Sequence, residues 1–214
     1  MAPVTECVLA PLKPGTNLEA LYKAAATTKA QPGNQGVRAG VLHEDPNQVR
    51  LFIGWDAIES HQAFRASPRF ATFMGEIAPH AAGPTTVMHA ELAPHPPAVL
   101  DTYGGVAEVL FAYFAPGADA GRNMAAAQGL VEGLRGAGFA GLGGESAVGW
   151  TVERDVDYGG EETRVLVILL GWDSVDAYEK ARATDVYGRL VAGFRGAAEG
   201  FKGFDISHVT TKTL

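Results

Sequence analysis

One phrase occurs twice in this chain, and the repetition is the feature that most constrains its fold. The first copy, LFIGWDAIESHQAF, runs from Leu51 to Phe64, and the second, LLGWDSVDAYEKAR, runs from Leu169 to Arg182. In both copies Gly-Trp-Asp ends an apolar run and an amphipathic stretch follows. A repetition of this kind predicts a structure that is built twice on one plan.

Two further pairs of segments extend the match in the same order along the chain. VTECVLAPLKPG near the N-terminus parallels VAEVLFAYFAPG, which places Glu6 on Glu108. VMHAEL parallels ISHVTT, which places His89 on His208. Three ordered matches indicate an internal duplication rather than chance similarity between short apolar patterns.

Each copy is predicted to contain the elements β-α-β-β-α-β, which is the ferredoxin-like plan. In the first copy we expect strands at 4–10, 37–43, 49–55 and 86–92, with helices at 17–30 and 56–77. In the second copy we expect strands at 106–114, 147–154, 163–172 and 204–211, with helices at 119–135 and 174–198. Asp56 and Glu59 have the spacing of a capping box at the start of a helix, and Asp173 with Asp176 forms a weaker one.

The division of the chain follows from the repeat. Residues 1–92 are predicted to form the first repeat and 106–214 the second, and the segment 93–105, APHPPAVLDTYGG, is predicted to be a linker because of its proline and glycine content. Strands 49–55 and 163–172 are apolar on both faces, so each sheet must be covered twice. The predicted fold class is α+β, with two antiparallel sheets packed into one barrel-like core.

Composition narrows the range of partners. The chain has 214 residues, of which 47% are hydrophobic, and its net charge is -7 at pH 7. This charge argues against nucleic acid or an anionic membrane as partner, because phosphate binding requires a basic face. The N-terminus lacks the basic start and long apolar core of a signal peptide. Cys7 is the single cysteine, and both observations predict a cytoplasmic location.

The duplicated pattern resembles the dimeric α+β barrel superfamily, and within it the antibiotic-biosynthesis monooxygenase-like domains, as a fused pair. The resemblance implies a small-molecule enzyme that acts on an aromatic or polyketide-like substrate by cofactor-free oxidation after proton abstraction. Its alternatives are a polyketide cyclase, decarboxylase or lyase, and a non-catalytic small-molecule-binding or stress-response protein. As to assembly, whole chains could also pair into a homodimer through their outer surfaces.

The resemblance can be carried to individual residues. The phrase WDSVDAY, with Trp172 and Tyr178, is similar to the one found in anthrone-oxidising monooxygenases, and the first copy keeps Trp55 but has His61 in place of the tyrosine. Haem-degrading relatives carry a histidine ligand where this chain has Met74 or Val191, which predicts no haem. The histidines also lack the regular spacing of a metal site. We therefore expect no cofactor and no metal.

The predicted catalytic residues are His89, Glu6, His61 and His208. The last strand of a ferredoxin-like sheet pairs with the first, so Glu6 is expected beside His89, and Glu108 beside His208, as pairs in which a carboxylate orients a general base. His89 is the first candidate base and His61 the second. The alternative is that His89 and His208 are strand residues without a catalytic role.

The predicted substrate-binding residues are Trp55, Phe64, Trp172, Tyr178 and Arg182. Aromatic side chains would hold an aromatic substrate by stacking, and the arginine would pair with a carboxylate or phenolate. The alternatives are that the tryptophans fill the core below the helix start and that the arginine lies on a solvated helix face.

Overall fold

The computed structural model describes residues 2–101 and 105–214 of the chain. The first repeat comprises β1 (Val4–Pro11), α1 (Leu18–Ala26), the 3-10 helix η1 (Thr27–Ala30), β2 (Asn34–Val41), β3 (Gln48–Trp55), α2 (Ile58–Arg65), α3 (Pro68–Ile77) and β4 (Thr86–Ala90). The 3-10 helix η2 (Ala98–Asp101) follows. The second repeat comprises β5 (Val106–Phe114), α4 (Ala120–Gly136), β6 (Leu142–Trp150), β7 (Val156–Tyr158), β8 (Glu161–Trp172), α5 (Val175–Arg182), α6 (Asp185–Ala197), β9 (Phe201–Val209) and β10 (Lys212–Thr213).

The two sheets have the same strand order. The first is β10-β2-β3-β1-β4 and the second is β6-β8-β5-β9, with β7 paired to β8. In both, the last long strand of the repeat lies antiparallel to the first, so that Glu6 is opposite His89 and Glu108 is opposite His208. The predicted fold class, two ferredoxin-like repeats with antiparallel sheets, is confirmed.

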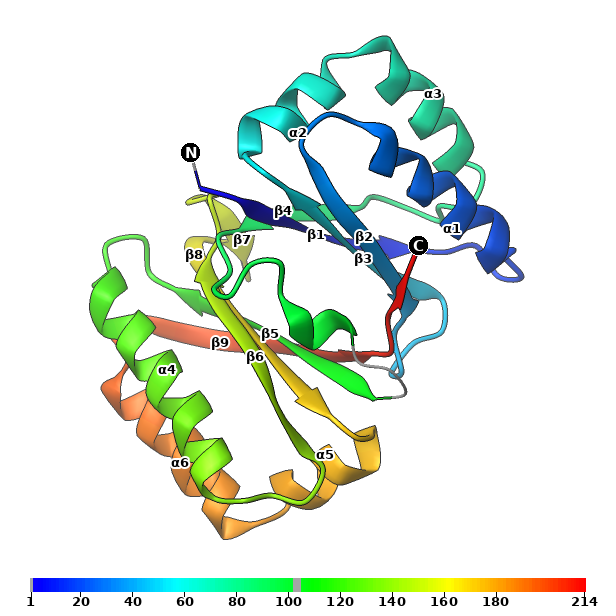
Figure 1. Cartoon of the computed structure of the whole chain (residues 1–214). Helices are drawn as coiled ribbons and strands as arrows, with labels where there is room; N and C mark the ends of the chain where they lie inside the picture. The colour runs from blue at the N-terminus through cyan, green and yellow to red at the C-terminus, as the bar shows by residue number, and fades with distance from the viewer. Residues whose placement is uncertain (1, 102–104) are drawn as a thin grey trace.

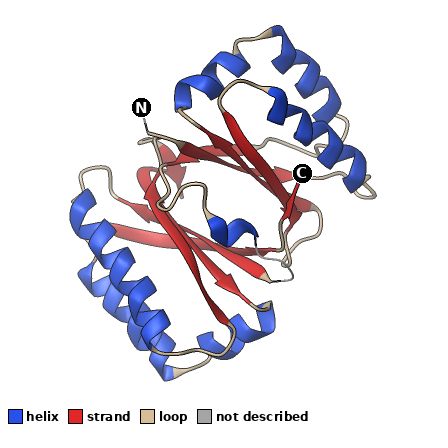
Figure 2. Ribbon diagram, in the orientation of Figure 1, coloured by secondary structure: helices blue, strands red, loops and turns tan. Residues whose placement is uncertain are grey.

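The sheets face each other, and each repeat carries its helices on the outside (Figures 1 and 2). The layer between them is a continuous apolar core that includes Cys7, Phe52 and Met88 from the first sheet and Val109 and Phe111 from the second. Each repeat therefore covers the open face of the other. This is why both alternating faces of β3 and β8 are apolar.

The repeats also exchange short edge contacts that extend each other's sheets. The connection after β2 bridges Leu42 to Val209 at the edge of the second sheet, and the connection after β6 bridges Thr151 to Ala90 at the edge of the first. At the C-terminus, β10 pairs with β2 of the first sheet (Figure 1). These contacts relate the two repeats by an approximate twofold arrangement.

The segment between the repeats contains η2, whose Val99 and Leu100 are buried in the core between the sheets. Ala93 bridges Val148 on the edge strand β6. Part of the predicted linker, residues 102–104, lies outside the described residues. The segment is therefore packed against the protein in the part that can be described.

The start of the helical segment after β3 was predicted wrongly. Ala57, not Asp56, is the N-cap residue of α2, and Asp56 accepts a hydrogen bond from the Ser60 hydroxyl instead. In the second repeat Ser174 caps α5 by accepting from the Ala177 N–H. The expected long helix is also divided in each repeat. In the first repeat Pro68 begins the new helix α3, because a proline cannot continue the helix before it.

The helical layers of the two repeats are packed differently. Helix α3 has no buried residue, whereas the corresponding helix α6 buries Tyr187 and Phe194. The first repeat is therefore more open between its helices and its sheet. Among the described residues, no helix has the length and apolar character needed to cross a membrane.

Candidate active site

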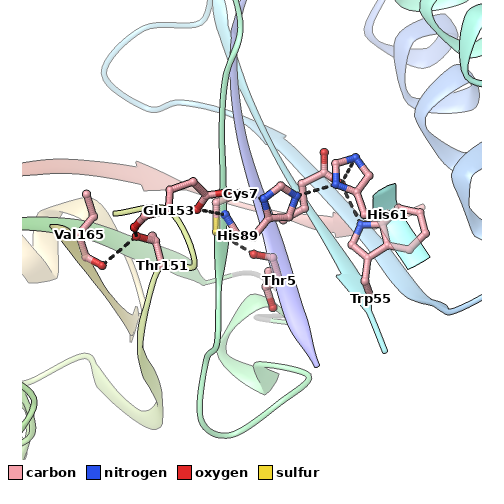
Figure 3. Close-up of polar contacts among 9 residues, drawn as sticks. Thr5, Cys7, Trp55, His61, His89, Thr151, Glu153 and Val165 are labelled. Carbon is pink, nitrogen blue, oxygen red and sulfur yellow. Dashed lines mark hydrogen bonds and ion pairs between the residues drawn. The ribbon is translucent and has the colours of Figure 1, made fainter. Parts of the chain in front are cut away.

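A chain of polar side chains crosses from the second repeat into the first. Glu153, in the connection between β6 and β7, accepts two hydrogen bonds from His89 on β4: one from the backbone N–H at 2.9 Å and one from Nδ1 at 2.6 Å. On the other side of the ring, His89 Nε2 lies 2.6 Å from Nδ1 of His61 on α2. Figure 3 shows Glu153, His89 and His61 in this order. We call these three residues the relay.

The relay ends beside a buried carboxyl group. His61 Nε2 lies 3.6 Å from Glu6 Oε2, and the same oxygen accepts a hydrogen bond of 2.8 Å from the indole N–H of Trp55. The Trp55 ring stacks on His61 with centroids 5.3 Å apart. Glu6, His61 and His89 are all buried, so their interactions are little screened by water.

The hydrogen positions of the relay follow from its first member. An ionised Glu153 can only accept, so His89 must carry its proton on Nδ1 and present a lone pair at Nε2. That lone pair accepts from His61, which therefore carries its proton on Nδ1 as well. The remaining lone pair, on His61 Nε2, is free to take a proton. The relay is thus assembled as a base with one defined tautomer.

The electrostatics agree with this assignment. Burial opposes ionisation of Glu153, but the hydrogen bonds from the His89 ring and backbone outweigh it, and the pKa of Glu153 lies below its usual value. Burial, with the neighbouring His89 and Arg65, lowers the pKa of His61 to about 4. Burial raises the pKa of Glu6 despite its hydrogen bond from Trp55. At neutral pH His61 is therefore uncharged and able to accept a proton.

His61, whose Nε2 faces Glu6, lines a cavity in the first repeat together with that carboxyl group. The cavity has a volume of about 260 Å³ and lies between the sheet and helices α1 to α3. Most of its lining is apolar, including Leu51, Phe70 and Phe73. Its polar lining residues are Glu6, His61, Arg65, His80 and Thr85. An apolar cavity with a few convergent polar groups is the usual form of a small-molecule site.

The second repeat contains the same arrangement in part. Glu44, in the connection between β2 and β3, accepts from the His208 N–H at 3.0 Å, and its Oε1 lies 2.5 Å from His208 Nδ1. Trp172 donates to Glu108 at 2.7 Å, as Trp55 does to Glu6. The difference is Tyr178, which takes the place of His61 and packs against His208 with ring centroids 4.2 Å apart.

This second arrangement is incomplete and closed. Among the described residues, neither His208 Nε2 nor Glu108 Oε1 has a hydrogen-bond partner, and Tyr178 stands at the position that His61 has in the first repeat. The surrounding space is filled by a cluster that includes Trp172, Tyr178, Tyr187 and Phe194. Burial raises the pKa of Glu108 to about 7.

The structure brings together three of the predicted catalytic residues but joins them differently. Glu6 lies opposite His89 in the sheet, yet the carboxylate bonded to His89 is Glu153, and Glu6 instead meets His61. The expected direct Glu6–His89 pair was wrong because His61 stands between them. His208 is paired with Glu44 and not with Glu108.

The predicted binding residues do not line the cavity: two lie beside His61 and three lie in the second repeat. The described residues that line the cavity include neither Trp55 nor Phe64, which are buried in one aromatic cluster with His61. Trp172 and Tyr178 are buried in the closed second repeat. The side chain of Arg182 is 58% exposed and lies 3.4 Å from Glu179. Arg65, its counterpart, is the arginine at the cavity.

Two glutamates that form hydrogen bonds with the strand histidines, Glu44 and Glu153, were not found from the sequence. Each follows the second strand of its own repeat, β2 or β6, at the same distance from the strand's last residue. Aligning VLHED with WTVER reveals this equivalence. Their contact with the opposite repeat could not be read from the sequence, because it depends on how the two sheets dock.

Glu6, His61 and His89 also have the residue types of a metal site, and their potential ligand atoms all lie within 4.8 Å of one another. Two nitrogen ligands of one tetrahedral zinc ion, each at about 2.0–2.1 Å from it, would be separated by about 3.3 Å. His61 Nδ1 and His89 Nε2 are only 2.6 Å apart. This spacing fits a shared proton and does not fit two ligands of one ion.

Comparison with known proteins agrees with this architecture. The model of the antibiotic biosynthesis monooxygenase family matches residues 15–76, which include Trp55 and His61. No curated protein sequence is significantly similar to the chain.

Solved structures match over the whole chain. An anthrone oxidase-like protein has a TM-score of 0.64 at 16% identity, over 100% of this chain and 94% of that one. A proposed monooxygenase from Lactobacillus acidophilus NCFM has a TM-score of 0.60 at 11% identity, over 100% of both chains. A proposed monooxygenase from Fusobacterium nucleatum has a TM-score of 0.62 at 9% identity, over 99% of this chain and 94% of that one. At these identities the likeness shows the fold.

The resemblance found in the sequence is confirmed: residues 15–76 of the first repeat match the model of the antibiotic biosynthesis monooxygenase family, and the whole chain has the two-repeat α+β fold of these solved structures.

Proposed function

We propose that the protein oxidises an aromatic or polyketide-like molecule in the cavity of the first repeat, with His61 as the general base and without a bound cofactor. The observation that carries this proposal is the relay, which ends with a free His61 lone pair at a mostly apolar cavity. His89 was the first candidate base from the sequence. It lies behind His61 and therefore acts as a positioning residue.

The reaction begins with transfer of a proton from an activated CH2 group of the substrate to His61 Nε2. The resulting carbanion is delocalised over the adjoining aryl or carbonyl groups and reacts with O2 to form a carbon–oxygen bond. Protonation of this peroxide by His61, loss of the second C–H proton and cleavage of the O–O bond give a ketone and water. The substrate supplies all four electrons, so that CH2 and O2 become C=O and H2O.

The cavity favours a substrate with fused rings and an acidic group. A cavity of roughly 150 Å³ holds one benzene molecule, and the volume of about 260 Å³ leaves room for more than one ring. Arg65 is exposed at the cavity and could pair with the phenolate or enolate that forms when the proton leaves. In the second repeat, the space around Tyr178 is occupied by the buried side chains of its cluster, including Trp172 and Tyr187.

Anthrone is a suitable first probe, because its CH2 group lies between two aryl rings and its oxidation to anthraquinone is visible by absorbance. We expect the purified protein to consume O2 and anthrone in equal amounts and to release anthraquinone. A general base contributes about 10²–10⁴-fold in rate, so His61→Ala should lose at least about a hundredfold of the enzymatic rate.

The outcomes separate the proposal from its alternatives. Turnover of polyketide-like probes without O2 uptake would favour the cyclase, decarboxylase or lyase alternative. Saturable binding without turnover would favour a binding protein. Oxidation that His61→Ala leaves unchanged would contradict the assignment of the base.

A further inference from the structure

We propose that Glu153 of the second repeat is a positioning residue for the site of the first repeat, so that one working site is built from both halves of the chain. This inference rests on the proposed function. It assigns to the second repeat a role in the reaction, although the interior of that repeat is closed.

The contact between Glu153 and His89 is built by the docking of the two repeats. The connection after β6 lies along the exposed edge of β4, where the Val152 N–H donates to the His89 carbonyl at 2.7 Å and Thr151 bridges Ala90. These backbone bonds hold the connection in place. Figure 3 shows the Glu153 side chain next to the His89 ring. The carboxylate then accepts from both His89 N–H groups, which fixes the ring's orientation and its tautomer.

The tautomer decides whether the relay can work. If the His89 proton moved to Nε2, that nitrogen would face His61 Nδ1 as a donor. His61 would then have to shift its own proton to Nε2, the atom at the cavity, and it would lose the lone pair that accepts a proton. Glu153 therefore determines the state of His61 through His89, without touching the substrate.

The approximate twofold arrangement supplies a matched control. Glu44 makes the same contact with His208, and the His43 N–H donates to the His208 carbonyl at 2.9 Å, as Val152 does to that of His89. Both glutamates bridge the two repeats and both contribute to docking. Of the two glutamates, Glu153 is connected through its histidine to His61, which lines the cavity. Glu44 has no such connection among the described residues, because Tyr178 replaces His61 in the second repeat.

The test compares Glu153→Gln with Glu44→Gln in the full chain. Glutamine has nearly the same size but carries no charge, and its amide group can donate to His89. We expect Glu153→Gln to lower kcat on anthrone about 10- to 100-fold with KM within about twofold, by analogy with the effect of residues that orient metal-bound histidines. Glu44→Gln should keep kcat and KM within about twofold. The melting temperatures of the two variants measure how much each substitution weakens the packing of the two repeats against each other.

A second measurement does not depend on turnover. In ¹⁵N-labelled wild-type protein the imidazole of His89 should show a single tautomer with hydrogen on Nδ1, and in Glu153→Gln this should change to a mixture of tautomers. If no probe is oxidised but this change occurs, the proposed function fails and the positioning role stands. If His89 keeps its tautomer and kcat is unchanged in Glu153→Gln, or if Glu44→Gln lowers kcat equally, the positioning role is contradicted.

Discussion

His61 and Tyr178 occupy equivalent positions in the two repeats, but they contact the neighbouring histidine in different ways. His61 lies 2.6 Å from His89 and continues the chain of hydrogen bonds to the cavity. Tyr178 packs its ring against His208, whose Nε2 has no partner among the described residues. One difference in residue type therefore separates a connected site from a disconnected one.

The first prediction tests this asymmetry directly. Replacing His61 with tyrosine, the residue of the second repeat, removes the base, and we expect kcat/KM on anthrone to fall by about 10²–10⁴-fold. The matched control is Tyr178→Phe, which removes a hydroxyl from the closed repeat and should leave kcat/KM within about twofold. Equal losses in the two variants would show that the repeats contribute alike.

The second prediction concerns the pH dependence of kcat/KM. His61 must be uncharged to accept a proton, and its pKa is lowered to about 4, by burial first and by His89 and Arg65 next, against the opposing effect of Glu153. Activity should therefore stay constant from neutral pH down to about pH 5 and decline toward pH 4, the pKa of His61. Glu6 also faces His61, and Glu6→Gln distinguishes its contribution. A decline centred near pH 6.5, the pKa of an ordinary histidine, would contradict this prediction.

The third prediction concerns stability. An unfolded chain ionises Glu108 above about pH 4.5, but burial keeps the folded group protonated up to about pH 7. Glu108 should therefore contribute a loss of stability as pH rises from 4.5 to 7, of about 3 kcal/mol if its full shift in pKa is expressed. Glu108→Gln keeps an acceptor for Trp172 and removes this loss.

Urea unfolding at pH 4.5 and pH 8 measures the effect. The difference in the free energy of unfolding between Glu108→Gln and wild type should be larger at pH 8 than at pH 4.5, in favour of the variant. Glu179→Gln, at an exposed position on α5, is the control. An equal difference at both values of pH would mean that Glu108 ionises in the folded state as it does in the unfolded chain.

The fourth prediction concerns metals. The spacing of His61 and His89 fits a shared proton, so dialysis against a chelator should leave both the oxidation rate and the melting temperature unchanged. Elemental analysis of the protein before and after dialysis provides the matching measurement. One equivalent of a divalent ion, lost together with activity and absent from His61→Ala, would instead identify these residues as ligands.

The fold could be predicted because the repeated phrases fix both the element order and the pairing of strands. Glu6 and Glu108 were placed opposite His89 and His208 by the ferredoxin-like plan alone, and the structure has this register. The apolar character of both faces of β3 and β8 predicted that the sheets cover each other, as the core between them shows. The helix start after β3 was predicted wrongly, because the Asp56 side chain accepts from the Ser60 hydroxyl and Ala57 is the N-cap residue.

The site could be predicted only in part, because it depends on contacts between repeats. His89, His61 and Glu6 were named from residue type and position, but their order in the relay was not. That order depends on the rotation of α2 over the sheet and on the side chain of Glu153, which lies in a connection without any distinctive motif. Docking geometry of this kind is not encoded in local periodicity.

The most direct test of the account is the tautomer of His61 and His89 together with the titration of His61, measured by long-range ¹H–¹⁵N correlation on the wild-type protein. Signals are assigned with His61→Ala and His89→Ala, and no substrate is needed. The account predicts that at pH 7 both rings carry their hydrogen on Nδ1, and that His61 takes up a second proton near pH 4. Hydrogen on Nε2 of either ring, or protonation of His61 near pH 6.5, would contradict it.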